Sequence, residues 1–150
     1  MSLETLPGHL ARRFHQISTA LFDIEMERAG LDLTPVQYAA LEAVYGQPDI
    51  DQVTLSGLIA YDRTTIGGVV DRLVQKGLLT RCTNEIDRRA RVLSVSAHGE
   101  QILMSARPVV AKAQEQLVSG LDAQEASELA RLLKKAIKAL HETSRGAPHL

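Results

Sequence analysis

Apolar residues recur with a helical period over most of the chain. In residues 9–28 they form one stripe, and Gly30 is predicted to end this first helix. The stripe consists of Leu10, Phe14, Ile17, Leu21 and Ile24. The segment Thr34-Pro35-Val36-Gln37 has the features of a helix start. Thr34 supplies a capping hydroxyl, a proline occupies the first helical position and Gln37 occupies the third. A second helix is therefore predicted over residues 35–45.

A helix with two adjacent glycines in its middle is predicted after residue 62. Its apolar positions have the spacing of one buried helical face, and they are Ile66, Val69, Val70, Leu73 and Val74. Gly67 and Gly68 each cost about 1 kcal/mol relative to alanine in a helix interior, so we expect a gain elsewhere. Residues 54–61 are apolar enough for a short preceding helix, and Asp62 is predicted to cap the glycine-containing helix. Residues 46–53 are predicted to form a loop.

Further along the chain the period changes from helical to alternating, which predicts a β-hairpin. Its strands cover residues 79–83 and 91–95, and a polar connection rich in arginine joins them. Ser96 is predicted to cap a long helix that runs to about residue 119 and bends at Pro108.

The order of helix, turn, helix and hairpin predicts a winged helix-turn-helix lobe over residues 34–96. The capping signature formed by Asp122 and Glu125 is predicted to open a last helix. The helices in residues 8–30 and 97–145 are too long and too apolar to be buried by this small lobe alone. We therefore expect them to be dimerisation helices that pack against a second copy, as in two-fold DNA-binding proteins. The predicted fold is mainly α with a small β-hairpin wing, in a single chain of 150 residues.

The composition indicates a folded protein in which only one stretch is basic. Hydrophobic residues make up 45% of the chain and charged residues 23%, which is typical of a globular domain. The net charge is −1, but residues 61–92 carry seven basic and four acidic side chains, whereas residues 1–60 have a net charge of −5. One basic region on an acidic chain favours a single nucleic-acid-binding face. The alternative is that the three extra charges form an ordinary solvated surface.

Several classes of protein are disfavoured by what the sequence lacks. Its N-terminus has no apolar run of signal-peptide length, and no segment approaches the roughly 20 apolar residues of a membrane span, so a cytoplasmic protein is predicted. A single cysteine, Cys82, excludes an intrachain disulfide framework. The histidines do not have metal-ligand spacing, and nucleophile motifs and phosphate loops are missing. We therefore predict no metal, no cofactor and no enzymatic activity.

The outward face of the glycine-containing helix carries the residue types that read DNA. Hydroxyls, an amide and an arginine stand opposite the apolar face, and a helix in the major groove reads base edges with such side chains. Gly68 would let the helix axis come close to the DNA. The alternative is that the glycines allow tight packing against a neighbouring element, with Gly67 the better candidate.

The hairpin adds positive charge beside that helix. Arg88 and Arg89 at its tip are predicted to reach phosphate or an adjacent minor groove, while Asp87 pairs with Arg89 to hold the turn. The predicted DNA-binding residues are Thr54, Arg63, Thr64, Thr65, Gly68, Arg72, Gln75, Arg88, Arg89 and Arg91.

The chain resembles the MarR (multiple-antibiotic-resistance regulator) family of bacterial winged helix-turn-helix regulators. The resembling segments are LTPVQYAAL, DRTTIGGVVDRLVQKGLL and DRRARVLSVSAHG, the last with the wing pattern Asp87-Arg88-Arg89. The resemblance implies a homodimer that binds pseudopalindromic double-stranded DNA. It further implies release of the DNA when a small molecule, often a phenolic or aromatic acid, binds between the dimerisation and DNA-binding lobes. The glycine-containing segment is most similar to members that control the degradation of aromatic acids.

Arg13 is the candidate anchor for such an effector. It borders the apolar stripe of the first helix, where an arginine needs an anion. A ligand carboxylate would supply that anion, with His9 one turn earlier and a hydroxyl or ring wall from Tyr38. The alternative is that Arg13 pairs with a carboxylate of its own chain or of a partner.

The sequence thus favours a homodimeric repressor released by a small aromatic acid. Two other hypotheses stay open. The first is a DNA-binding regulator without an aromatic ligand, either constitutive or redox-responsive through Cys82. The second is a dimerisation module that does not bind DNA.

Overall fold

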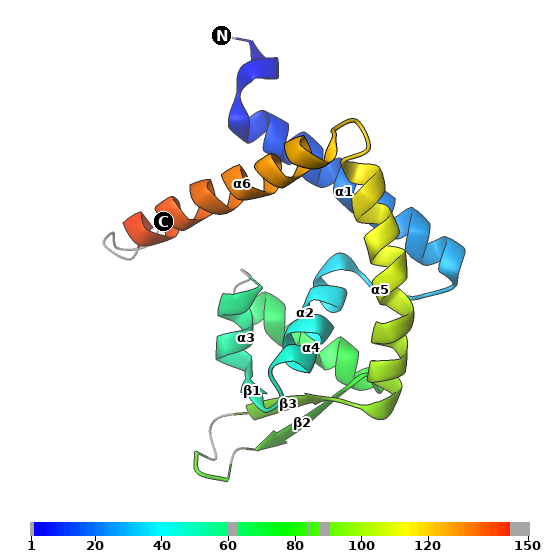
Figure 1. Cartoon of the computed structure of the whole chain (residues 1–150). Coiled ribbons are helices and arrows are strands. Elements are labelled where there is room, and N and C mark those ends of the chain that lie inside the picture. The colour runs from blue at the N-terminus through cyan, green and yellow to red at the C-terminus, as the bar shows by residue number, and fades with distance from the viewer. Residues whose placement is uncertain (1, 60–62, 84, 88–90, 145–150) are drawn as a thin grey trace. The chain divides into compact units, whose positions relative to one another are not determined.

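The computed structural model describes residues 2–59, 63–83, 85–87 and 91–144, with the side chains of residues 63, 64 and 142–144 left aside. Residues 1–114 and 115–150 form two compact units. The helices are a short 3-10 turn, Leu3–Thr5, and α1 Pro7–Ala29, α2 Pro35–Gly46, α3 Gln52–Leu58, α4 Arg63–Gln75, α5 Ala97–Leu117 and α6 Ala123–Ser144. The strands are β1 Ile50–Asp51, β2 Leu79–Thr83 and β3 Arg91–Val95 (Figure 1).

The predicted helix boundaries are confirmed where a capping signal is local. Gly30 ends α1 in the left-handed conformation, with φ +68°, which glycine adopts without strain. At the start of α2, the Gln37 amide donates to the Thr34 hydroxyl and the Thr34 amide donates to the Gln37 side chain, each at 3.2 Å. The same reciprocal pair forms between Asp122 and Glu125 before α6. Each pair satisfies two backbone N–H groups that a helix end otherwise leaves without a partner.

The segment between α2 and α3 differs from its prediction. Residues 50–51, expected to lie in a loop, form β1, which pairs antiparallel with β3 so that Ile50 faces Leu93 across the ladder. Helix α3 begins at Gln52 and ends at Leu58, earlier than the predicted 54–61. Asp51 explains the earlier start, because its carboxylate accepts from the Thr54 amide at 2.7 Å and caps the helix.

The predicted hairpin is confirmed and belongs to a three-stranded sheet of order β1-β3-β2. Its register pairs Leu79 with Val95 and Thr83 with Arg91. In Figure 1, β2 and β3 extend away from the start of α5. The predicted pairing of Asp87 with Arg89, and the capping by Asp62, lie outside the described residues.

One hydrophobic core joins the helix-turn-helix elements to α1 and α5. Ile66, Val70 and Leu73 of α4 are fully buried in it, as the helical spacing predicts, while Val74 is 36% exposed. Phe22 and Met26 of α1 and Leu103 and Ala106 of α5 belong to the same cluster. The predicted lobe, residues 34–96, therefore lies inside the first unit together with α1 and most of α5.

The predicted apolar stripe of α1 does not face this core. Leu10, Ile17 and Ile24, spaced by seven residues, are between 45% and 49% exposed. In the second unit, α6 is likewise amphipathic, and Leu132, Leu133, Ile137 and Leu140 are exposed. Each helix thus presents an apolar row that the single chain leaves in contact with solvent.

The start of α5 is fixed against the turn that follows α4. Gly77 has φ +73°, and the next carbonyl, that of Leu78, accepts from the Ser96 amide at 3.0 Å. The Ser96 hydroxyl accepts from the Gly99 amide at 2.9 Å, which confirms the predicted cap. A Cβ atom on Gly99 would lie 2.0 Å from the Leu78 carbonyl oxygen, so only glycine fits there.

Gly99→Ala is expected to lower the free energy of unfolding by about 1–3 kcal/mol, because the new methyl group collides with backbone. Gly68→Ala is the matched control, since a Cβ there has nothing within 4 Å and alanine favours the helix by up to about 1 kcal/mol. Urea unfolding followed by circular dichroism at one protein concentration measures both. Equal midpoints for the two variants would contradict a tight contact between Gly99 and Leu78.

Candidate nucleic-acid interface

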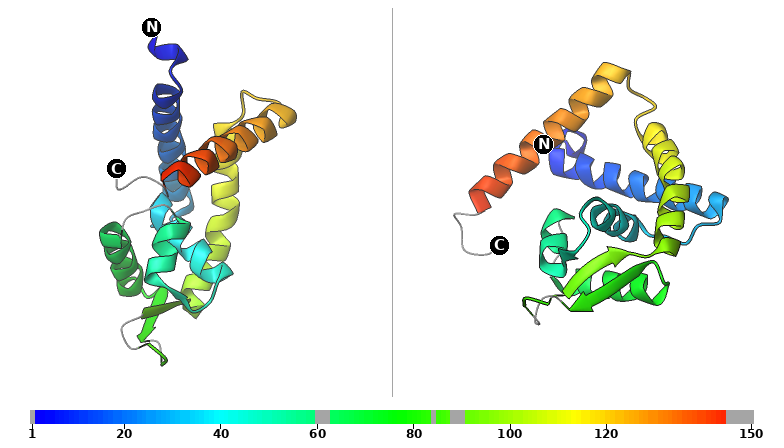
Figure 2. Two further views of the ribbon diagram at one scale, coloured as in Figure 1. Left: turned by 90° about the vertical axis from the view of Figure 1, so that its left-hand side faces the viewer. Right: turned by 60° about the horizontal axis from the view of Figure 1, so that its bottom comes forward.

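The face of α4 opposite the core is open to solvent. Thr65, Gly68, Arg72 and Gln75 are exposed, as is Asp71 on the same face. Figure 2 shows α4 at the edge of its unit in the left-hand view. Within the described residues, the side chains of Arg72 and Gln75 make no hydrogen bond or ion pair. These two side chains therefore retain free donors and, at Gln75, a free acceptor.

The two glycines of α4 are not required by packing against described residues. A Cβ on Gly68 would meet nothing within 4 Å, and one on Gly67 would lie 3.6 Å from Gln52 Nε2, an ordinary contact distance. Close packing against described residues therefore does not account for Gly68, and the surface at this position is open.

Other predicted DNA-binding residues are distributed around α4. Thr54 is exposed on α3, and its hydroxyl donates to Asp51 Oδ2 at 2.7 Å. These hydrogen bonds, that from the Thr54 amide first, lower the pKa of the Asp51 carboxyl. Arg91 is exposed at the start of β3. The side chains of Arg63 and Thr64, and all of Arg88 and Arg89, lie outside what the structure describes.

An ion pair that the sequence did not indicate joins α4 to the sheet. Arg81 on β2 contacts Asp71 on α4, with Nη2 2.6 Å from Oδ1. The Arg81 side chain is 20% exposed and the Asp71 side chain 60%. The pair holds the hairpin beside α4 and partly neutralises an acidic group on the face that DNA would approach.

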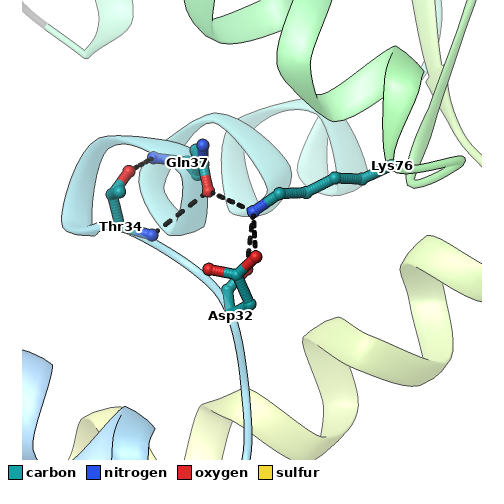
Figure 3. Close-up of polar contacts among 4 residues, drawn as sticks. All are labelled: Asp32, Thr34, Gln37 and Lys76. Atoms are coloured by element: carbon teal, nitrogen blue, oxygen red, sulfur yellow. Dashed lines mark hydrogen bonds and ion pairs between the residues drawn. The ribbon is translucent and has the colours of Figure 1, made fainter.

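A second group of contacts surrounds the end of α4. Lys76 Nζ lies 2.8 Å from the Asp32 carbonyl oxygen, 3.1 Å from Asp32 Oδ2 and 3.1 Å from Gln37 Oε1. Figure 3 shows this lysine reaching from the end of α4 to the first turn of α2. A hollow of about 540 Å³ opens here, lined by Asp32, Thr34, Gln37, Arg72, Gln75 and Lys76.

The predicted effector residues lie on two different helices. His9 and Arg13 are on α1 and Tyr38 is on α2, where its ring packs 6.2 Å from that of Phe22. His9 Nδ1 contacts Arg12 at 3.4 Å rather than Arg13. Arg13 is exposed, and within the described residues its guanidinium has no anionic partner.

Tyr38 belongs to a polar network between α2 and α5 that the sequence did not reveal. Its hydroxyl donates to Glu42 Oε1 at 2.7 Å, and Arg107 donates to both oxygens of Glu42 at 2.8 and 3.0 Å. The Arg107 guanidinium also lies 5.0 Å from the centre of the Tyr45 ring. Burial and the bond to Glu42 raise the pKa of Tyr38 to about 12, so the hydroxyl stays protonated at neutral pH. The hydrogen bonds from Arg107 lower the pKa of Glu42 and raise that of Arg107.

Other chemistry is not supported by the described residues. Among them, no group of three histidine, cysteine, aspartate or glutamate side chains is placed to hold a metal ion. No helix in the described ranges is both long and apolar enough to cross a membrane. Cys82 is exposed on β2.

Comparisons with known proteins place this arrangement in a family. A model of the MarR family matches residues 31–90, which run from before α2 to the hairpin. The transcriptional regulator HosA of Escherichia coli O157:H7 is 30% identical over 135 residues, covering 90% of this chain and 97% of HosA. The chain belongs to the MarR family. It is a DNA-binding transcriptional regulator, and the predicted winged helix-turn-helix is confirmed.

Two solved structures of MarR-family regulators resemble the chain over nearly its whole length. PcaV of Streptomyces coelicolor, in complex with its natural ligand, is 30% identical with a TM-score of 0.86, covering 93% of this chain and 97% of PcaV. BpsR of Bordetella bronchiseptica, whose DNA binding is regulated by 6-hydroxynicotinic acid, is 26% identical with a TM-score of 0.85. The match covers 91% of this chain and 96% of BpsR.

The Glu42 network gives this MarR-family protein a pH-dependent part of its stability. Because the folded state lowers the pKa of Glu42, its contribution is present above the usual value of 4.5 and is lost as the pH falls through the lowered value. Glu42→Gln is expected to lower the urea midpoint at pH 7, and its difference from the wild type is expected to narrow below about pH 4.5. Urea unfolding at a series of pH values measures this.

Glu128→Gln is the matched control for that experiment. Glu128 pairs with Arg131 on α6, where both side chains are more than half exposed, so its removal is expected to have little effect on stability. A similar loss in the two variants, or a Glu42→Gln difference that is constant with pH, would contradict a stabilising role for the network.

Proposed function

We propose that this regulator is a homodimeric repressor whose α4 enters the major groove of an operator and which a small aromatic carboxylic acid releases. The main support for insertion of α4 into the major groove is the open face of this helix. Its centre, at Gly68, lacks a side chain and has nothing within 4 Å of the Cβ position, while Arg72 stands one turn further on. A flat helical face with polar side chains is suited to contact with base edges.

The other predicted residues complete the interface. Thr65 and Gln75 would read bases beside Gly68, and Arg63 and Thr64 would act at the start of α4. Arg88, Arg89 and Arg91 would bind phosphate or the adjacent minor groove from the wing. The local excess of positive charge in residues 61–92 supports this arrangement, because phosphate contacts supply much of the affinity for DNA.

Dimerisation is supported by the apolar rows on α1 and α6. Large apolar side chains that remain roughly half exposed are unfavourable in water, and a second copy offers an identical row to cover them. A two-fold dimer would set two α4 helices about one DNA turn, roughly 34 Å, apart on a pseudopalindromic operator. We also infer that this regulator is not an enzyme. As a DNA-binding protein, it is proposed to act in the cytoplasm.

The effector class is inferred from Arg13 and from similarity. Arg13 has no anionic partner within the described residues, and a ligand carboxylate would form charge-assisted hydrogen bonds with it. His9 would join it, and Tyr38 would supply a hydroxyl or a ring wall. BpsR responds to 6-hydroxynicotinic acid, an aromatic acid. Such an effector must bind the two dimer geometries with different affinity, typically by about 1–3 kcal/mol.

The first experiment is selection of an operator from random DNA, followed by fluorescence anisotropy at several salt concentrations with a panel of aromatic carboxylic acids. Sequence-specific binding that one acid releases is the expected result. Equal binding to scrambled DNA would contradict the reading role of α4. Specific binding that no acid changes would favour a constitutive regulator, and release by an oxidant alone would favour a redox response through Cys82.

Gly68→Leu is expected to reduce operator affinity at least about 100-fold, the equivalent of one or two lost base contacts, because the side chain holds α4 away from the groove. The fold should persist, since the position is open. Gly46→Leu, at an equally open position at the end of α2, is the control and should bind normally. Operator affinity that is unchanged in Gly68→Leu would contradict close approach at this glycine.

Arg13→Ala is expected to leave operator affinity within about twofold of the wild type and to weaken the response to the effector by about tenfold or more, as for a lost charged hydrogen bond. Arg131→Ala, which removes an exposed arginine of α6, is the control. The acid concentration for half-release from the operator measures the response. A normal response in Arg13→Ala would mean that the carboxylate binds elsewhere.

A further inference from the structure

We infer that Lys76 is a positioning residue for DNA reading: its ammonium group fastens the end of α4 to the first turn of α2 and thereby sets the direction of Arg72 and Gln75. The inference rests on the proposed reading role of α4. Lys76 follows Gln75, the last residue of α4, so it acts at the point where that helix ends.

The attachment point on α2 is itself fixed. Gln37 is only 4% exposed, and its Oε1 accepts both from the Thr34 amide at 3.2 Å and from Lys76 at 3.1 Å. The backbone carbonyl of Asp32 supplies a second fixed acceptor at 2.8 Å. Lys76 is therefore bonded to a capped helix start and its preceding backbone, which have little freedom to follow a moving lysine (Figure 3).

Lys76 does not have the properties of a phosphate contact. An ammonium group has three N–H donors, and three protein oxygens lie within 3.1 Å of this one. Its side chain is 29% exposed, whereas the Asp32 carboxylate beside it is 96% exposed and would repel phosphate. The positive charge of Lys76 is thus used within the protein.

The consequence for DNA reading follows from the position of the hollow. Arg72 and Gln75 line it together with Lys76, Gln37 and Asp32, so they belong to the same end of α4. A shift of α4 at this end moves both side chains relative to a groove, and base contacts depend on such placement. Contacts to phosphate depend on it much less, so loss of the attachment should reduce discrimination between sequences.

The test uses Lys76→Met in the full-length protein, with the selected operator and a scrambled duplex. Operator affinity is expected to fall about tenfold, the effect of one lost charge-assisted hydrogen bond, while affinity for the scrambled duplex stays within about twofold. The slope of log affinity against log salt should not change. Lys135→Met, which removes one positive charge from exposed α6, is the control and should leave both affinities unchanged.

Asp32→Ala separates positioning from simple electrostatics by the sign of its effect. Removing an acidic group beside the interface would strengthen binding to any DNA if charge alone mattered. If positioning matters, this variant weakens operator binding, and its effect and that of Lys76→Met are less than additive, because both act on the same attachment.

Three outcomes would overturn the inference. A salt slope that falls by about 0.9 for each lysine replaced would make Lys76 a phosphate ligand. If Lys76→Met lost affinity equally on both duplexes and had a lower urea midpoint, Lys76 would contribute only to the stability of the protein. If Lys76→Met distinguished the operator from the scrambled duplex as well as the wild type does, Lys76 would not be a positioning residue. A wild-type protein that does not discriminate would instead overturn the proposed reading role of α4, on which this inference depends.

Discussion

The close contact between the turn after α4 and the start of α5 is the constraint on which the first unit depends. The Leu78 carbonyl accepts from the Ser96 amide and lies where any side chain of residue 99 would begin. Gly77, at φ +73°, turns the chain so that this carbonyl can point at α5. Because backbone meets backbone there, the direction in which α5 leaves the sheet and the position at which α4 ends are fixed together.

Two polar contacts restrain α4 further, one toward the sheet and one toward α2. Arg81 connects it to β2 through Asp71, and Lys76 connects its end to α2. Ile66, Val70 and Leu73 hold its inner face in the core. Because α4 is restrained on these sides, a change in the direction of α5 would change the placement of α4 as well. That rigidity is what a regulator needs if a distant ligand is to affect DNA binding.

The sequence could predict the parts of this arrangement that depend on neighbouring residues. The capping pair Thr34 and Gln37, the stop at Gly30 and the buried face of α4 each depend on residues only a few positions apart in the sequence. β1 could not be predicted, because two residues form a strand only when β3, some 40 positions later, lies beside them. The contacts of Lys76 with Asp32 and of Arg107 with Glu42 span 44 and 65 positions, and a charged side chain gives no local sign of its partner.

The first turn of α2 lies between a proposed effector residue, Tyr38, and the helix proposed to read DNA, α4. Gln37 accepts from Lys76 at the end of α4, while its neighbour Tyr38 packs on Phe22 of α1 and donates to Glu42, which Arg107 of α5 holds. Adjacent residues of one helical turn move together, since their backbone bonds are shared. An acid that competed for the Tyr38 hydroxyl would therefore act on the same turn of α2 that holds Lys76. Through Tyr38 and Gln37, which are neighbours on α2, a ligand bound at the proposed effector residues would have a short mechanical path to the residues proposed to read DNA.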